Sequence, residues 1–158
     1  MGGTYLIPAE PDFQLDFLTP LHRGGDTPYV HPQLHITLQP LPVMEFSLES
    51  VEQAVLFCGE GAVLVNVLSP ERYALHKLVV YGERTGAFRV KSSKDLVQAA
   101  CLLEFLWNHR HDALEESLAD MLTRGKGWRA RLTQGALALR KAYPELAAGE
   151  WLAGATAR

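Results

Sequence analysis

The apolar residues of this chain change their spacing at Ser69, and that change constrains the fold more than any other feature. Before Ser69, apolar and β-branched residues occur in short runs separated by proline and glycine, which is typical of β-strands. After it, apolar residues recur mainly every three to four positions, which is typical of amphipathic helices. The sequence therefore predicts an α+β fold, in which a small sheet precedes a helical C-terminal region.

The first part of the chain contains two predicted strands. Thr4 to Ile7 is a short β-type run, and the segment from Phe13 to Leu18 alternates apolar and polar residues. The alternation places Asp16 on the face opposite Phe13. Residues 10–12 are interpreted as a loop because they contain a proline, and the turn-rich residues 19–28 are predicted to be a surface loop.

A hairpin and a series of helices are predicted next. Residues 51–57 and 62–68 are apolar runs around a glycine-containing turn, so we expect two core strands. Ser69 and Pro70 are helix-start signals for a helix to about residue 81. Further helices are predicted from residue 92 or 93 onward, at 112–122 and at 127–143, while residues 147–158 are expected to fray. The predicted domain boundary separates residues 1–86 from the helical residues 87–158.

Composition limits the class of protein. With 158 residues, 47% of them hydrophobic, the chain has the length and apolar content of one globular domain. A net charge of −3 argues against a dedicated nucleic-acid or membrane-surface protein. No apolar stretch approaches membrane-spanning length and no signal peptide is recognisable, so a cytoplasmic location is expected. The only cysteines, Cys58 and Cys101, are predicted to be separate buried thiols.

Three segments together resemble the bacterial nucleotidyltransferase-fold family related to abortive-infection toxin nucleotidyltransferases. They are Phe13-Gln-Leu-Asp-Phe-Leu-Thr-Pro20, Pro70-Glu-Arg-Tyr-Ala-Leu-His-Lys-Leu78 and Lys94-Asp-Leu-Val-Gln-Ala-Ala100. The resemblance extends from about residue 4 to about residue 143. It implies a partial nucleotidyltransferase-like sheet packed on helices and followed by a helical C-terminal tail.

The resemblance also implies a set of site residues. Asp16 matches the family's third catalytic carboxylate, a magnesium ligand, and Lys77 is placed near the phosphates of a nucleoside triphosphate. Tyr73 shares a helix face with Lys77. Lys94 and Asp95 belong to the scaffold around the nucleotide site, where they are expected to fix the Lys77 helix through an ion pair. A surface aspartate and a helix-end lysine are the structural alternatives for Asp16 and Lys77.

The family's Gly-Ser turn and Asp-x-Asp pair have no counterpart in the sequence, and the resemblance would place them upstream of Met1. Three interpretations follow. The chain is one half of a split enzyme, a non-catalytic binding or assembly module, or the product of a start codon placed too late. Because half a domain would expose strand edges, a homo-oligomer or a complementing protein chain is expected as a partner.

A basic segment near the C-terminus is a second candidate for binding. Its members, predicted to contact nucleic acid, are Arg124, Lys126, Trp128, Arg129 and Arg131. Basic side chains can bind a phosphate backbone while an indole stacks on a base. The structural alternative is the charged outer face of an amphipathic helix.

Overall fold

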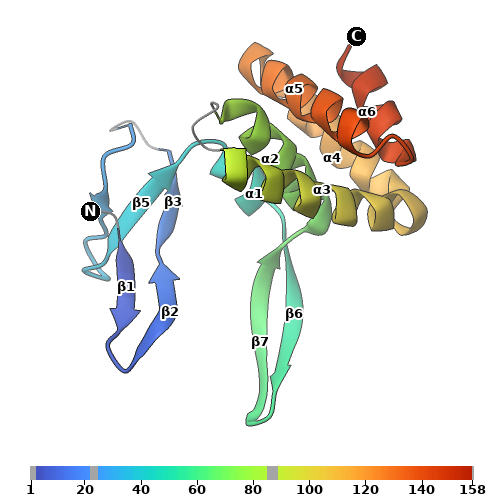
Figure 1. The fold of residues 1–158 in the computed structure, drawn as a ribbon. Coiled ribbons are helices and arrows are strands. Elements are labelled where there is room, and N and C mark those ends of the chain that lie inside the picture. The colour runs from blue at the N-terminus through green and yellow to red at the C-terminus, as the bar shows by residue number, and fades with distance from the viewer. Residues whose placement is uncertain (1–2, 22–24, 85–88, 158) are drawn as a thin grey trace. The chain divides into compact units, whose positions relative to one another are not determined.

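The computed structural model describes residues 3–21, 25–84 and 89–157, and it confirms the predicted α+β fold (Figure 1). The chain forms two compact units, residues 1–45 and 46–158. The domain boundary predicted at residues 86 and 87 lies outside the described residues.

The first unit consists of short strands. They are β1 (Thr4–Ile7), β2 (Glu10–Asp16), β3 (Leu18–Pro20), β4 (Tyr29–Val30) and β5 (Thr37–Leu41). Strands β1 and β2 are antiparallel, with Thr4 opposite Asp16, whereas β5 pairs in parallel with β3 and antiparallel with β4. Assigning residues 10–12 and 19–20 to loops was therefore wrong. Proline is tolerated where a strand lies at an edge or begins, and Glu10 pairs with Ile7 next to a register shift.

The second unit begins in α1 (Met44–Leu48), which spans the division between the units, and continues into a long hairpin (Figure 1). Strands β6 (Val51–Cys58) and β7 (Gly61–Leu68) pair antiparallel, as predicted, from Val51 opposite Leu68 to the turn. The prediction that they are core strands is wrong, because most of their side chains are exposed. Phe57 is the extreme case, with 82% of its surface accessible.

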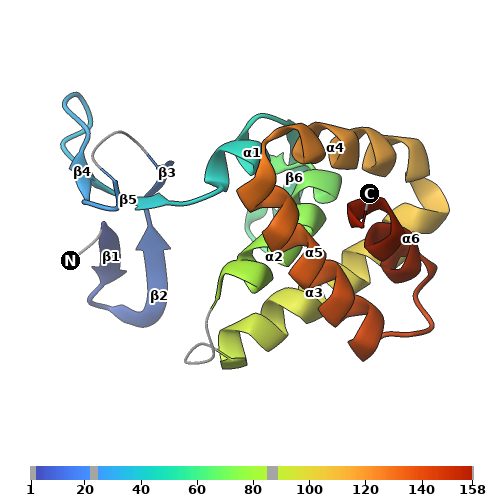
Figure 2. The same ribbon diagram turned by 90° about the horizontal axis from the view of Figure 1, so that it is seen from above.

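Five helices form the body of this unit. They are α2 (Pro70–Glu83), α3 (Arg89–His109), α4 (His111–Thr123), α5 (Lys126–Ala142) and α6 (Ala147–Thr156). Ser69 precedes α2, as predicted, although its hydroxyl oxygen accepts no capping hydrogen bond. Helices α2, α3 and α5 pack together, and Figure 2 shows α5 lying across α2. Their fully buried leucines include Leu75, Leu78, Leu103 and Leu132.

Two glycines allow α2 and α5 to approach closely. A Cβ added to Gly135 of α5 would lie 2.3 Å from the carbonyl oxygen of Leu78, and one added to Gly82 of α2 would lie 2.2 Å from that of Arg131. Both distances are far shorter than a van der Waals contact between non-bonded atoms. The helix pair can therefore pack at this separation only with glycine at these positions.

Two further predictions were wrong. Residues 147–156 do not fray but form α6, which buries Ala148 and Leu152. Cys58 and Cys101 are exposed rather than buried. The observed outcomes have local causes. Helix α6 forms because its apolar side chains recur at helical spacing, and each cysteine is exposed because it lies on an element with an exposed face.

Charged side chains join the root of the hairpin to the helices. Arg110 contacts Glu52 of β6 at 2.7 Å and the buried Glu71 of α2 at 2.6 Å. Arg72 lies 2.7 Å from Asp120, and together with other acids these groups line a polar cleft of about 540 Å³. The carboxylates outnumber the arginines, so the cleft is not an anion site.

Candidate functional site

The candidate site in the second unit begins with the sequence of α2. Buried apolar residues such as Ala74, Leu75 and Leu78 fix one face of this helix against α3 and α5. Tyr73 and Lys77, one helical turn apart, share another face and are only partly buried. The ammonium nitrogen of Lys77 lies 4.9 Å from the centroid of the Tyr73 ring, which is within the range of a cation–π contact.

A buried carboxylate of α3 holds this face of α2. Asp95 is only 3% exposed, and its Oδ1 accepts a hydrogen bond from Lys77 Nζ at 3.1 Å. Its Oδ2 lies 2.5 Å from Arg84, the residue after α2. The ion pair expected between the Lys77 helix and the Lys94–Asp95 segment is therefore present, and Asp95 forms it. Lys94 is exposed.

The charges of this cluster do not balance. Lys77 and Arg84 carry two positive charges and Asp95 one negative charge, so one positive charge remains. The side chains of Lys77 and Arg84 are 18% and 28% exposed, so both can be reached from solvent. Among the described residues, Asp95 is the acid paired with both cations, and the N–H groups that it does not use can bind an anion. Phosphate is a suitable anion, since an ammonium acts as a point charge and a guanidinium as a planar fork.

Arg84 was missed in the sequence, although a signal was present. It lies seven residues after Lys77, and positions seven apart share one face of a helix. The segment that resembles the family ends at Leu78, before the end of the helix, and so does not include Arg84.

Asp16 lies in the first unit, at the end of β2. Its carboxylate accepts hydrogen bonds from the Thr4 hydroxyl at 2.6 Å and from the Gln14 amide at 2.9 Å. These two hydrogen bonds, of which the one from Thr4 has the larger effect, lower the pKa of Asp16 below its ordinary value. The carboxylate is therefore ionised at neutral pH. It borders an open hollow of about 260 Å³ that Gln39 also lines. Phe17, the next residue, contacts the Tyr5 ring, whereas Asp16 contacts Thr4. Asp16 and the aromatic side chain therefore lie on opposite faces, as predicted.

Asp16 can give a magnesium ion one hard oxygen ligand. One carboxylate is not a magnesium site, and among the described residues no three or more His, Cys, Asp or Glu side chains come together as metal ligands. The residues present therefore do not make up the expected metal centre.

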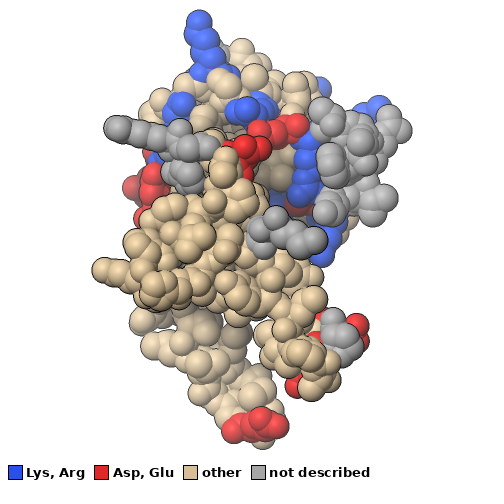
Figure 3. Space-filling model, turned by 90° about the vertical axis from the view of Figure 1, so that its left-hand side faces the viewer, with Lys and Arg blue, Asp and Glu red and all other residues tan. Residues whose placement is uncertain are grey.

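Several members of the basic segment already have partners within the chain. Arg124 is paired with Glu49 and lies 3.0 Å from Asp120, and its guanidinium is 5.8 Å from the Trp128 ring centroid. Its pKa is raised, mainly by the hydrogen bond to Glu49. Figure 3 shows one face of the molecule, where lysine and arginine side chains lie in several separate places.

The other members differ in exposure. Arg131 lies 3.6 Å from Glu83, Lys126 is exposed and Arg129 is partly buried. Lys126, Arg129 and Arg131 lie on α5 and correspond to the charged outer face of a packed helix, whereas Arg124 is the residue after α4. The role of the segment in binding nucleic acid stays a prediction.

Comparison with known proteins identifies the family. A family model described as a nucleotidyltransferase matches residues 4–123, which contain both Asp16 and the Lys77–Asp95–Arg84 cluster. The chain belongs to this nucleotidyltransferase family. No curated protein and no solved structure matches the chain. In the described part of this nucleotidyltransferase-family chain, no helix is long and apolar enough to cross a membrane.

Proposed function

We propose that this chain supplies part of a nucleotidyl-transfer site, and that Lys77 and Arg84 bind the phosphates of a nucleoside triphosphate. The observation that carries the proposal is the cluster around Asp95, in which two accessible cations share one buried carboxylate. The family match supports nucleotidyl transfer as the kind of reaction. In that reaction an acceptor hydroxyl attacks the α-phosphorus, and the bond to the departing pyrophosphate breaks.

Each residue has a distinct part in the proposal. Lys77 and Arg84 would neutralise charge on the triphosphate and its leaving group, which is a major source of stabilisation in such transfers. Asp95 is a positioning residue, because it touches the cations and not the nucleotide. Asp16, in the first unit, is proposed independently of this cluster as a single magnesium ligand. A complementing chain or segment would supply the Gly-Ser turn and the two other carboxylates.

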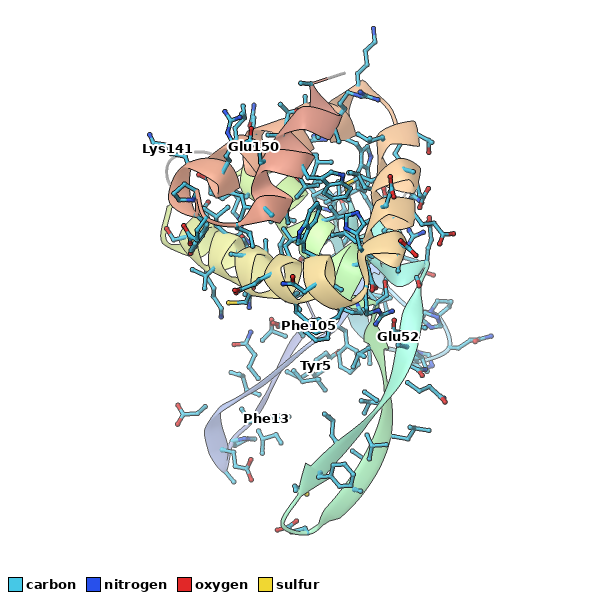
Figure 4. The ribbon with its side chains drawn as sticks, turned by 90° about the vertical axis from the view of Figure 1, so that its right-hand side faces the viewer. Tyr5, Phe13, Glu52, Phe105, Lys141 and Glu150 are labelled. Atoms are coloured by element: carbon cyan, nitrogen blue, oxygen red, sulfur yellow. The ribbon has the colours of Figure 1, made fainter. Side chains whose placement is uncertain are left out.

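Calorimetric titration with ATP, GTP, CTP and UTP in magnesium tests the proposal directly. Lys77→Ala should weaken binding about tenfold or more, because a hydrogen bond to a charged group contributes about 1.5–3 kcal/mol. Lys141→Ala is the matched control, since Lys141 is an exposed lysine on α5 (Figure 4) and should leave binding unchanged.

Asp16→Asn separates the metal part of the proposal from the phosphate part. Its effect should depend on magnesium, whereas the loss caused by Lys77→Ala should persist without the ion. If the folded wild-type chain binds none of the four nucleotides, the phosphate site is refuted. The remaining interpretation would then be a non-catalytic binding or assembly module.

A further inference from the structure

The β6–β7 hairpin has apolar residues on both faces. One face contains only apolar side chains between the root and the turn: Ala54, Leu56, Val63, Val65 and Val67. The other combines Val55, Phe57 and Leu64 with a polar pair, Gln53 and Asn66, near the root. Strands with apolar residues on both sides are typical of layers covered on both faces. Here Leu56 and Leu64 are exposed by 55% and 58%.

The hairpin is also almost uncharged. Its acidic residues are Glu52 at the root and Glu60 at the turn, and it contains no basic residue. In the described part of the chain, β6 and β7 pack mainly against each other. The hairpin therefore presents a contiguous exposed apolar surface, which marks an interaction site.

Helix α3 has a matching apolar stripe. Val97, Cys101 and Phe105 are spaced four residues apart on the side opposite the packed core, and all three are exposed. Phe105 is 52% exposed and projects from α3 on the side away from α6 (Figure 4). Leu96, Leu103 and other buried residues form the packed side of α3, and the exposed stripe forms a second apolar side. Two apolar sides are typical of a helix that is covered on both of them.

We infer that these two surfaces bind a second copy of this chain. In the proposed dimer, the two hairpins lie face to face through Leu56 and Val63. Each hairpin's other face lies on the α3 stripe of the other copy. Such an arrangement is self-complementary about a twofold axis, as isologous dimers require. It covers both faces of the hairpin and the exposed stripe with surfaces that the chain itself provides.

The dimensions agree with a specific dimer. Strands of eight residues are about 27 Å long at about 3.4 Å per residue, and the pair is about 10 Å wide, so each face covers about 270 Å². The apolar stripe of α3, from Val97 to Phe105, is about 12 Å long at about 1.5 Å per residue and about 10 Å wide. Counting both sides of each contact, the hairpin–hairpin contact and the two hairpin–helix contacts would bury about 1,000 Å² in all, which is the lower end of the range of specific interfaces.

Sedimentation velocity of the purified chain over a range of concentrations tests the inference. The wild type should sediment as a dimer. Leu56→Glu and Phe105→Glu should each raise the dissociation constant about a hundredfold or more, because each buries an unpaired carboxylate in an apolar contact. Leu137→Glu is the matched control. Leu137 is an apolar residue of α5 that is 46% exposed and lies outside both surfaces, so the variant should dimerise like the wild type.

The reactivity of Cys101 gives a second readout that needs no variant. Cys101 lies within the α3 stripe, so its rate of alkylation by a maleimide should fall about tenfold as the chain concentration rises through the dissociation constant. Circular dichroism checks that the variants are folded. A wild type that is monomeric at every concentration, or a Cys101 rate independent of concentration, overturns the inference. So does a dimer that Phe105→Glu and Leu137→Glu affect equally.

Discussion

Replacing Gly135 with alanine tests how closely α5 approaches α2. The added methyl group would lie 2.3 Å from the backbone oxygen of Leu78, and that oxygen cannot move unless the whole helix moves. The two helices would have to separate by about 1 Å to restore an ordinary contact. The same separation would loosen the apolar side chains along the seam, among them Leu75, Leu132 and Leu139.

The magnitude follows from the dispersion energy that the separation removes. About six side chains meet at the seam, each gaining about 1–2 kcal/mol of dispersion energy there, and a gap of this size removes a quarter to a half of that energy. The loss is then about 2–5 kcal/mol. The better helix propensity of alanine returns about 1 kcal/mol. Gly135→Ala should therefore lower the free energy of unfolding by about 1–4 kcal/mol, which lowers Tm by about 3–12 °C.

Urea and thermal unfolding monitored by circular dichroism measure this effect. The matched control is Gly154→Ala in α6, where nothing lies within 4 Å of the added Cβ. It should raise stability by about 0.5 kcal/mol. Gly82→Ala should resemble Gly135→Ala, and the double variant should lose less than the sum, because one separation of the helices relieves both clashes. Equal stability of Gly135→Ala and Gly154→Ala would refute the close packing.

Two further predictions concern charged groups of the second unit. Arg124 lowers the pKa of Glu49 through a hydrogen bond, so this pair stabilises the fold above the ordinary glutamate pKa. That contribution should disappear as the pH falls through the lowered pKa of Glu49. In urea titrations between about pH 7 and pH 3, the free energy of unfolding should therefore fall less for Glu49→Gln than for the wild type. Asp95→Asn removes the buried partner of Lys77 and should cost about 1–3 kcal/mol, less than a fully buried pair because the cation is partly exposed. Glu104→Gln, at an exposed position in the middle of α3, should cost almost nothing in the same unfolding assay.

The elements set by local signals were predictable. Helix α2 begins where Ser69 and Pro70 indicate, and the β6–β7 register follows from two apolar runs around a short glycine-containing turn. These features depend on residues close in sequence. The strand at residues 10–12 was not predictable from its composition, because pairing with Ile7 overrides the preference of Pro11 for a loop.

Burial of the hairpin was the main error, and its cause is general. An apolar pattern shows which side chains need to be covered, but not what covers them. The same limit applies to the basic segment. Arg124 pairs with Glu49, which lies between α1 and β6, and with Asp120 of α4. Glu83, the partner of Arg131, belongs to α2. Glu49 and Glu83 are distant in sequence, so the segment alone could not locate them, whereas Asp120 lies only four residues before Arg124.

The site shows the same division between local and distant information. The helical spacing of Tyr73 and Lys77 placed them on one face, and the family resemblance pointed to Asp95 as an ion-pair partner, which the structure confirms. Arg84 completes the cluster only because α2 continues beyond the matched motif and the chain then meets α3. A second cation on one carboxylate depends on helix packing, which the sequence pattern does not specify.

The root of the hairpin connects these observations. Because Arg110 bridges Glu52 of β6 and Glu71 of α2, the strands leave the helical body at a fixed position rather than from a free loop. A binding arm that is already ordered loses less conformational entropy when it meets its partner, so more of the buried apolar area contributes to affinity. Glu52→Gln would leave the apolar surfaces and the buried Arg110–Glu71 pair intact and remove only this anchoring. A weaker dimer in that variant would therefore show that the Arg110–Glu52 ion pair at the root acts by holding the hairpin in its binding orientation.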